Sequence, residues 1–147
     1  AKTLAGRVTD SKSGNRPMAA FPGHVFASVV AVWDPVSEVV KYFLPTALLF
    51  GQAGSVYGIN RVSKFLVSVC LRCADLVVSG YYDDFSQIEV EVLASSAREA
   101  LTSIFKLLGF QQAVDASKDS PFAKKFAPLG VEVDLNESKN GLIKSCS

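Results

Sequence analysis

The chain has 147 residues, enough for one domain with a core, and 49% of them are hydrophobic, as in an ordinary globular protein. Its 15 Lys and Arg nearly cancel its 14 Asp and Glu, which excludes the strongly basic balance of free-standing nucleic-acid binders. No apolar run is long enough to cross a bilayer and the first residues lack a signal-peptide pattern, so we expect an intracellular protein of the cytoplasm or nucleus, neither secreted nor membrane-bound.

Strand patterns separated by turn residues fill the first part of the chain. Residues 4–9 read as a strand, and the turn-rich segment 11–17 that follows would leave the Asp10 carboxylate exposed at its exit. Two β-branched and aromatic runs, 25–33 and 39–44, lie on either side of favourable turn residues and predict a hairpin. Aromatic residues in alternating strands usually fill cores, so we expect three of them to be buried there: Trp33, Tyr42 and Phe43.

A long helix is predicted over residues 55–73. Apolar side chains recur there every three or four positions, as on one face of a helix that packs on a sheet. Cys70 and Cys73 lie one turn apart in this stretch without a matching Cys or His pair, so we interpret them as buried thiols rather than as half of a zinc site.

Two strand patterns flank the run Tyr81-Tyr82-Asp83-Asp84-Phe85. Residues 76–78 precede it and residues 88–92 alternate polar with apolar after it, which would place the adjacent aspartates at a hairpin tip. Asp is a poor strand residue, so this pair breaks a local rule without a structural benefit. Most Asp-Asp pairs are solvated turn residues, but the flanking aromatics and the turn-exposed Asp10 favour a functional site.

The last third of the chain predicts a second helix and a final hairpin. The capping box Ser96-x-x-Glu99 opens an apolar stripe over residues 97–108 that ends before Gly109. Residues 129–135 and 142–143 then read as two strands joined by a turn with an Asn-Gly step. The whole order predicts an α+β fold in which two helices pack on one face of a largely antiparallel sheet and leave the other face for a ligand.

The three carboxylates of Asp10, Asp83 and Asp84 would make an oxygen-rich site if the sheet gathered them at one edge. Mg²⁺ prefers such ligands and is often shared with substrate phosphates. Two ions would support a phosphoryl transfer in which one activates the attacking 3′-hydroxyl and the other neutralises the triphosphate and the departing pyrophosphate. We therefore predict two Mg²⁺ ions, with Mn²⁺ as the alternative ion.

Several motifs in order resemble the reverse transcriptases of retroelements. Tyr81-Tyr82-Asp83-Asp84 is similar to that family's Tyr-x-Asp-Asp hairpin, and residues 48–57 resemble its Leu-Pro-Phe-Gly segment with the following helix. Downstream, residues 107–110, Lys118 and residues 126–134 look like the Leu-Gly-Phe, Lys and Leu-Gly-x-x-φ-Asp sequence of retroelement polymerases. Asp10-Ser11-Lys12-Ser13-Gly14-Asn15 can be laid on the family's Asp-Leu-Lys-x-Ala-Tyr.

The resemblance implies that residues 1–147 are a reverse-transcriptase palm with a ferredoxin- or RRM-like core, cut from a longer polyprotein. The fingers and thumb would be largely absent from these residues. Its activity would be RNA-directed DNA synthesis from deoxynucleoside triphosphates on an RNA or DNA template-primer. The implied catalytic metal ligands are Asp10, Asp83 and Asp84, with the carbonyl of Ser11.

The same resemblance implies contacts to the substrates. The nucleotide would be bound by the residues that match the family's triphosphate, base and sugar contacts, namely Ser13, Gly14, Asn15, Phe50, Gly51, Tyr82 and Lys118. The primer would be gripped by the turn at Leu129 and Gly130.

Two positions depart from the family pattern and keep an alternative open. Asn15 stands where the family has a bulky aromatic that excludes a ribose 2′-hydroxyl, and Leu49 stands where it has Pro. The alternative is a catalytically decayed palm that binds nucleic acid weakly at most. A third interpretation, a single-strand RNA-binding sheet, lacks the aromatic Lys/Arg-Gly-Phe-rich strand of that module.

Overall fold

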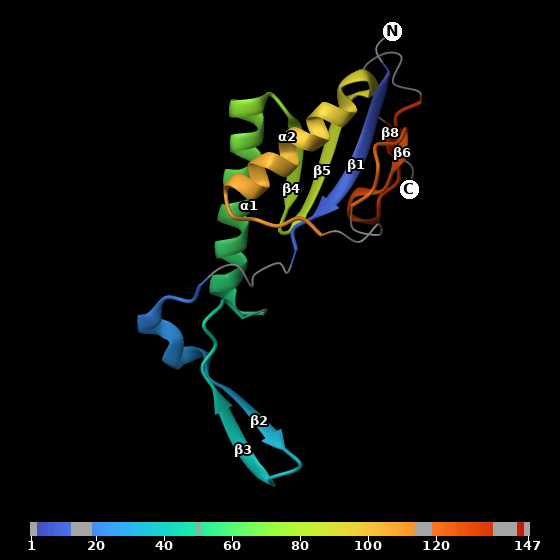
Figure 1. Cartoon of the computed structure of the whole chain (residues 1–147). Coiled ribbons are helices and arrows are strands. Elements are labelled where there is room, and N and C mark those ends of the chain that lie inside the picture. The colour runs from blue at the N-terminus through green and yellow to red at the C-terminus, as the bar shows by residue number, and fades with distance from the viewer. Residues whose placement is uncertain (1–2, 13–18, 50, 114–118, 137–143, 146–147) are drawn as a thin grey trace. The chain divides into compact units, whose positions relative to one another are not determined.

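The computed structural model describes residues 3–12, 19–49, 51–113, 119–136 and 144–145 of the chain. It confirms the α+β class, with antiparallel strand pairing throughout its described sheets (Figure 1). The chain forms two compact units, one made of residues 1–12 and 60–147 and the other of residues 13–59. None of the helices in the described ranges combines the length and the apolar composition that crossing a membrane requires.

The larger unit is built on a three-stranded sheet. Strands β1 (Leu4–Asp10), β5 (Asp84–Val90) and β4 (Val77–Tyr81) are hydrogen-bonded in the order β1-β5-β4. The predicted strands are confirmed, except that residues 91–93 form a 3₁₀ turn, η2 (Glu91–Leu93), where the sequence favoured strand up to residue 92. Val90 pairs with Leu4, the first residue of β1, and the Glu91 N–H then donates to the Thr3 carbonyl at 2.9 Å as the 3₁₀ turn begins.

Both long helices pack on one face of this sheet. The added Cβ of an alanine at Gly80 in β4 would lie 2.7 Å from Ser63 and 2.9 Å from Val67 of helix α1 (Ala53–Ala74). On the same face, the ring of Phe85 in β5 meets Phe105 of helix α2 (Ala94–Leu107) with centroids 5.0 Å apart. The core between helices and sheet consists of Leu66, Cys70, Leu76, Phe85, Ala97, Leu101 and Phe105.

Local details at the helices correct two predictions. The capping box at Ser96 is wrong, because α2 begins at Ala94 and the Ser96 hydroxyl donates to the Leu93 carbonyl at 2.9 Å. The predicted apolar stripe of α2 and its stop before Gly109 are confirmed, with Gly109 at φ +81°.

The two cysteines of α1 differ in burial. Cys70 is fully buried, and burial raises the pKa of its thiol to about 11. Cys73 is exposed, contrary to the prediction for it.

A second small sheet lies near the start of β1, on the face of the three-stranded sheet opposite the helices. It consists of β6 (Lys125–Phe126), β7 (Val133–Asp134) and β8 (Lys144–Ser145) in that order. The Phe126 ring lies directly over Gly6 of β1, where an added Cβ would come within 2.2 Å of it, so only glycine fits beneath the ring.

The predicted strand 129–135 is wrong over its first half. Residues Pro128–Gly130 form the 3₁₀ turn η3, in which Leu129 and Gly130 both have positive φ, and β7 has only two residues. The predicted strand 142–143 lies outside the described residues. Strand β8, which begins at the next residue after that segment, pairs with β7 in antiparallel orientation.

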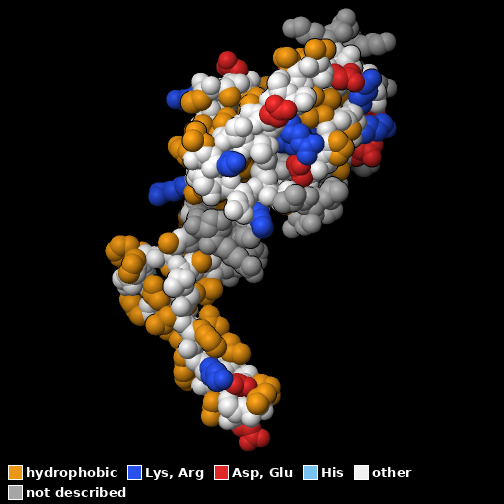
Figure 2. All heavy atoms as spheres, in the orientation of Figure 1, with side chains coloured by type: hydrophobic (Ala, Val, Ile, Leu, Met, Phe, Trp, Pro, Cys, Tyr) orange, Lys and Arg blue, Asp and Glu red, His pale blue; other side chains and the backbone are white. Residues whose placement is uncertain are grey.

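The smaller unit contains the predicted hairpin, formed by β2 (Val30–Asp34) and β3 (Val39–Phe43). Residues 25–28 are not strand but belong to the 3₁₀ helix η1 (Pro22–Ser28), which starts with a proline at its first position. The expected burial of the hairpin aromatics is also wrong, and Figure 2 shows hydrophobic side chains along its surface. Their exposed fractions are 57% for Trp33, 73% for Tyr42 and 53% for Phe43.

Candidate active site

Two of the predicted acidic residues face each other across neighbouring strands. Asp10 at the end of β1 is the direct antiparallel partner of Asp84 at the start of β5. The Ser11 N–H donates to the Asp83 carbonyl at 2.8 Å, so the Asp10–Asp84 pair falls at the adjacent non-hydrogen-bonded position. Side chains of such a pair lie on the same face with Cα atoms about 4.5 Å apart. The strand register therefore places two carboxylates side by side.

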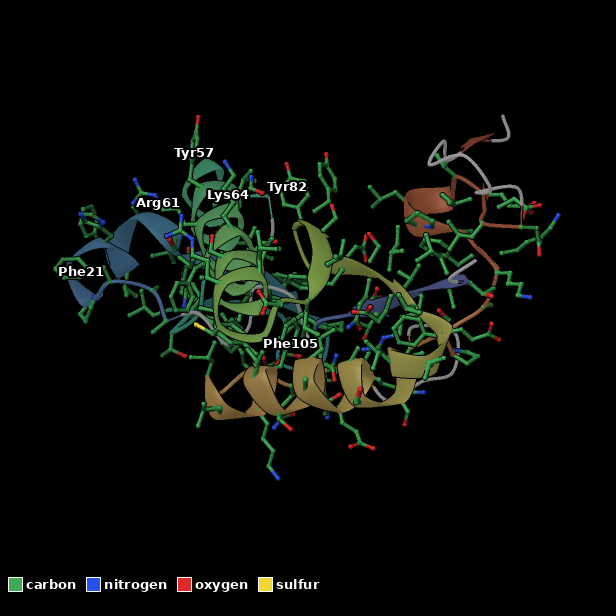
Figure 3. All side chains as sticks on the ribbon, turned by 90° about the horizontal axis from the view of Figure 1, so that it is seen from above. Phe21, Tyr57, Arg61, Lys64, Tyr82 and Phe105 are labelled. Carbon is green, nitrogen blue, oxygen red and sulfur yellow. The ribbon has the colours of Figure 1, made fainter. Side chains whose placement is uncertain are left out.

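Alternation along the strands puts this pair on the face opposite the helices. Phe85, the neighbour of Asp84, is buried against α2, so Asp84 and Asp10 point the other way. Tyr81 of β4 is also a direct partner of Asp84 and completes a row of three side chains across the sheet. In Figure 3, Tyr82 at the same hairpin projects away from α2, on which Phe105 lies.

The hairpin between β4 and β5 is a two-residue turn under strain. Tyr81 pairs with Asp84, so only Tyr82 and Asp83 connect the strands, and Tyr82 has φ +54°. Positive φ is an uncommon conformation for a bulky aromatic residue and costs about 1 kcal/mol or more. The rings of Tyr81 and Tyr82 meet edge to face with centroids 4.6 Å apart, which helps to hold this turn.

Two of the three predicted carboxylates, those of Asp10 and Asp84, share a row of the sheet. Among the residues that the structure describes, no group of three or more His, Cys, Asp or Glu is arranged to hold a metal ion. Asp83 follows Tyr82 in the turn, so its carboxylate is not in the cross-strand row of Asp84 and Asp10. Mg²⁺ in nucleotide sites commonly uses one or two carboxylates together with substrate phosphates.

The remaining predicted residues divide into four groups. Ser11 and Tyr82 lie beside the acidic pair, at the end of β1 and at the hairpin tip. Leu129 and Gly130 belong to η3, which lies against β5 in the same unit. Gly51 has φ +88° and belongs to the other unit. The predictions for five residues fall outside the described part of the chain: Ser13, Gly14, Asn15, Phe50 and Lys118.

An ion network that sequence reasoning missed lies on the helix side of β1. The fully buried Arg7 donates from Nη1 to Asp119 at 2.9 Å and from Nε to Gln87 at 3.0 Å, and Arg98 of α2 also binds Asp119. Burial lowers the pKa of Arg7, and the nearby positive charge of Arg98 lowers it further, while Asp119 opposes both effects.

Signals for part of the missed chemistry were present in the sequence. Arg7 shares its face of β1 with Ala5 and Thr9, whereas the more apolar Leu4 and Val8 are on the other face, so alternation alone does not predict its burial. Once its burial is known, a carboxylate partner is expected. Tyr81 is three residues before Asp84 across a two-residue turn, which places both on one face. Nothing local in the sequence identifies Asp119 as the partner, because it lies 112 residues after Arg7.

Comparison of the chain with family models and with curated proteins gave no match. The likeness to reverse transcriptases therefore depends on the motifs of the chain itself.

Proposed function

We propose that this chain is the palm of a retroelement RNA-directed DNA polymerase, which adds deoxynucleotides to a primer on an RNA or DNA template. The observation that carries the proposal is the direct pairing of Asp10 with Asp84 on the sheet face that the helices leave open. The motif Tyr81-Tyr82-Asp83-Asp84, which carries the resemblance, lies at the adjoining β4–β5 hairpin.

The Asp10–Asp84 pairing breaks a local rule of sheet structure. Like charges directly opposite each other in a sheet are destabilising, and the strained turn at Tyr82 adds a further local cost. Local rules are broken most often at functional sites, where the rest of the fold holds the unfavourable arrangement in place.

The roles of the residues follow from their places on the sheet. Magnesium ions, when bound, would activate the 3′-hydroxyl and neutralise the triphosphate. Asp10 and Asp84 would hold the cations from two adjacent strands, and Asp83 would join them from the adjoining turn. The exposed Tyr81 ring and the neighbouring Tyr82 offer faces on which a base or the primer end can stack. Leu129 and Gly130 would contact the primer.

Template and primer need more surface than the acidic row provides. The chain carries a formal net charge of only +1, whereas polymerases bind the phosphate backbone through many basic contacts. We therefore include the fingers and thumb of a longer polyprotein among its partners.

The test is single-nucleotide incorporation on an RNA template by the polyprotein that contains this chain. Asp84→Asn and Asp10→Asn should each reduce Mg²⁺-dependent incorporation by at least about 100-fold, because removing a key electrostatic group from an active site commonly costs that much. Asp75→Asn is the matched control, since Asp75 is exposed and lies between α1 and β4 at φ +51°, which Asn tolerates well. Incorporation that Asp84→Asn leaves unchanged would reject the proposed function.

A second candidate is the catalytically decayed palm. It is favoured by the finding that no three potential metal ligands are grouped together in the described ranges of the chain. This candidate predicts that the unaltered polyprotein incorporates no nucleotide with either Mg²⁺ or Mn²⁺, while weak binding to template-primer persists.

A further inference from the structure

A pocket of about 540 Å³ lies on the helix side of the larger unit, between α2 and the segments next to β1. Its described lining includes three cations, Lys12, Arg98 and Lys106, and one carboxylate, Asp119. Figure 2 shows basic side chains on this side of the molecule, around α2 of Figure 1. The pocket is distinct from the acidic row, because Asp10 and Asp84 point to the opposite face of the sheet.

The charges of this pocket leave a positive excess. Asp119 already binds two guanidinium groups, Arg98 at the pocket and the buried Arg7 behind it. Lys12 and Lys106 form no hydrogen bond or ion pair through their amines with other described residues. Three cations against one carboxylate leave two net positive charges in the described lining. Such an excess gives this field the sign that attracts anions.

The buried network adds to this field from behind the pocket wall. Nη2 of Arg7 is buried and has no hydrogen-bond partner among the described residues. The positive charge of Arg98 is close enough to lower the pKa of Arg7, so the two guanidinium groups repel each other across the Asp119 carboxylate. An anion in the pocket would offset that repulsion.

The walls indicate the chemical class of the ligand. Phe110 lines the pocket and packs against the hydrophobic core, which fixes an aromatic ring beside the cations. The volume falls in the range of small-molecule pockets, about 300 to 1,000 Å³. A phosphate monoester carries about −1.5 to −2 charges at pH 7, which matches the two excess positive charges. A long polyanion fits less well, because the chain as a whole has a net charge of only +1.

We propose that this pocket binds a small aromatic phosphate monoester, with the phosphate between Lys12 and Lys106 and the aromatic group against Phe110. Lys12 is positioned for this role by its backbone N–H, which donates to the Gln111 carbonyl at 2.7 Å. Arg98 stays paired with Asp119 and contributes charge at longer range. The site does not depend on the proposed polymerase activity.

The test is a binding titration of the 147-residue chain with adenosine 5′-monophosphate in EDTA, followed by backbone amide shifts. The largest shifts are expected at residues 106–113. Lys106→Gln and Lys12→Gln should each weaken binding about tenfold, which is the effect of losing one charge-assisted hydrogen bond. Both lysines are exposed, so these variants should retain the thermal unfolding midpoint of the unaltered chain.

Two control variants make the result specific. Lys64→Gln removes an exposed cation from α1 and should leave the affinity unchanged, and so should Asp84→Asn at the acidic row. Inorganic phosphate should bind about tenfold more weakly than the nucleotide, because it lacks a group for Phe110. The proposal is overturned if the double variant of Lys12 and Lys106 binds as tightly as Lys64→Gln, if phosphate binds as tightly as the nucleotide, or if neither probe binds.

Discussion

Replacing Asp119 with asparagine should destabilise the larger unit by about 3 kcal/mol. Arg7 is fully buried, and Asp119 accepts from its Nη1 at 2.9 Å, so the variant would leave a buried guanidinium without its counter-charge. Removing one partner of a buried ion pair costs about 3 to 5 kcal/mol. We expect the lower end of that range, because the Asp119 side chain keeps 18% exposure and Gln87 still accepts from Nε of Arg7.

Urea unfolding followed by circular dichroism measures this loss. With a slope of about 1.5 kcal/mol per molar urea, the midpoint should fall by about 2 M while the slope stays the same. Asp75→Asn is the control for removing a carboxylate from an exposed position. Arg98→Gln breaks the more exposed half of the network, where the Arg98 side chain is 44% exposed, and should cost less than about 1 kcal/mol.

One ranking of the urea midpoints of these variants would contradict a stabilising role for the Arg7–Asp119 pair. If Asp119→Asn shifts the midpoint no more than Arg98→Gln does, the buried Arg7 does not need the Asp119 charge. The buried pair would then contribute to the geometry of the pocket wall but not to the stability of the fold.

Three further predictions concern other parts of the chain. The hydrogen bond from Lys41, with smaller contributions from the adjacent turn, lowers the pKa of Asp34 from 3.8 to about 2. Its stabilisation of the hairpin should therefore be complete above pH 3.8 and disappear as the pH falls through about 2, and Lys41→Gln should raise the NMR titration midpoint toward 3.8. An alkylating reagent should modify Cys73 in the folded chain well before Cys70, as mapped by peptide mass spectrometry. Gly80→Ala should lower the free energy of unfolding by about 1 to 3 kcal/mol, because the new methyl group overpacks the helix–sheet interface.

Each of these predictions has an outcome that contradicts it. A midpoint for Asp34 that stays the same in Lys41→Gln would show that the lysine does not cause the shift. Equal rates of alkylation at Cys70 and Cys73 would contradict the burial of Cys70 in the core. Gly54→Ala is the control for the glycine change, since a Cβ there meets nothing within 4 Å, and it should not be destabilising.

Periodic patterns were sufficient to predict the layer of helices and sheet. The stripe at Ala97, Leu101 and Phe105 faces the core as its spacing required, and the strands on both sides of the acidic hairpin pair as expected. Asp84 and Asp10 come together because their strands are antiparallel neighbours, a pairing that strand patterns can suggest but whose register only the fold determines.

Other features depended on tertiary structure that local patterns do not contain. Residues 25–28 have β-branched and aromatic character, yet Pro22 starts a 3₁₀ helix over them. Trp33 and its hairpin neighbours have the composition of core residues, but the described part of their unit supplies no layer that buries them. Strand β7 is short because the positive φ of Leu129 and Gly130 turns the chain just before it.

The pairing of two carboxylates as one cation site is tested most directly by a Mn²⁺ titration of the 147-residue chain, followed by paramagnetic broadening of its amide signals. We predict saturable broadening centred on Asp10 and Asp84 together, with competition by Mg²⁺ and loss of the effect in Asp84→Asn but not in Asp75→Asn. Broadening that does not saturate, or that persists at Asp10 in Asp84→Asn, would contradict a shared ion site and with it the proposed chemistry.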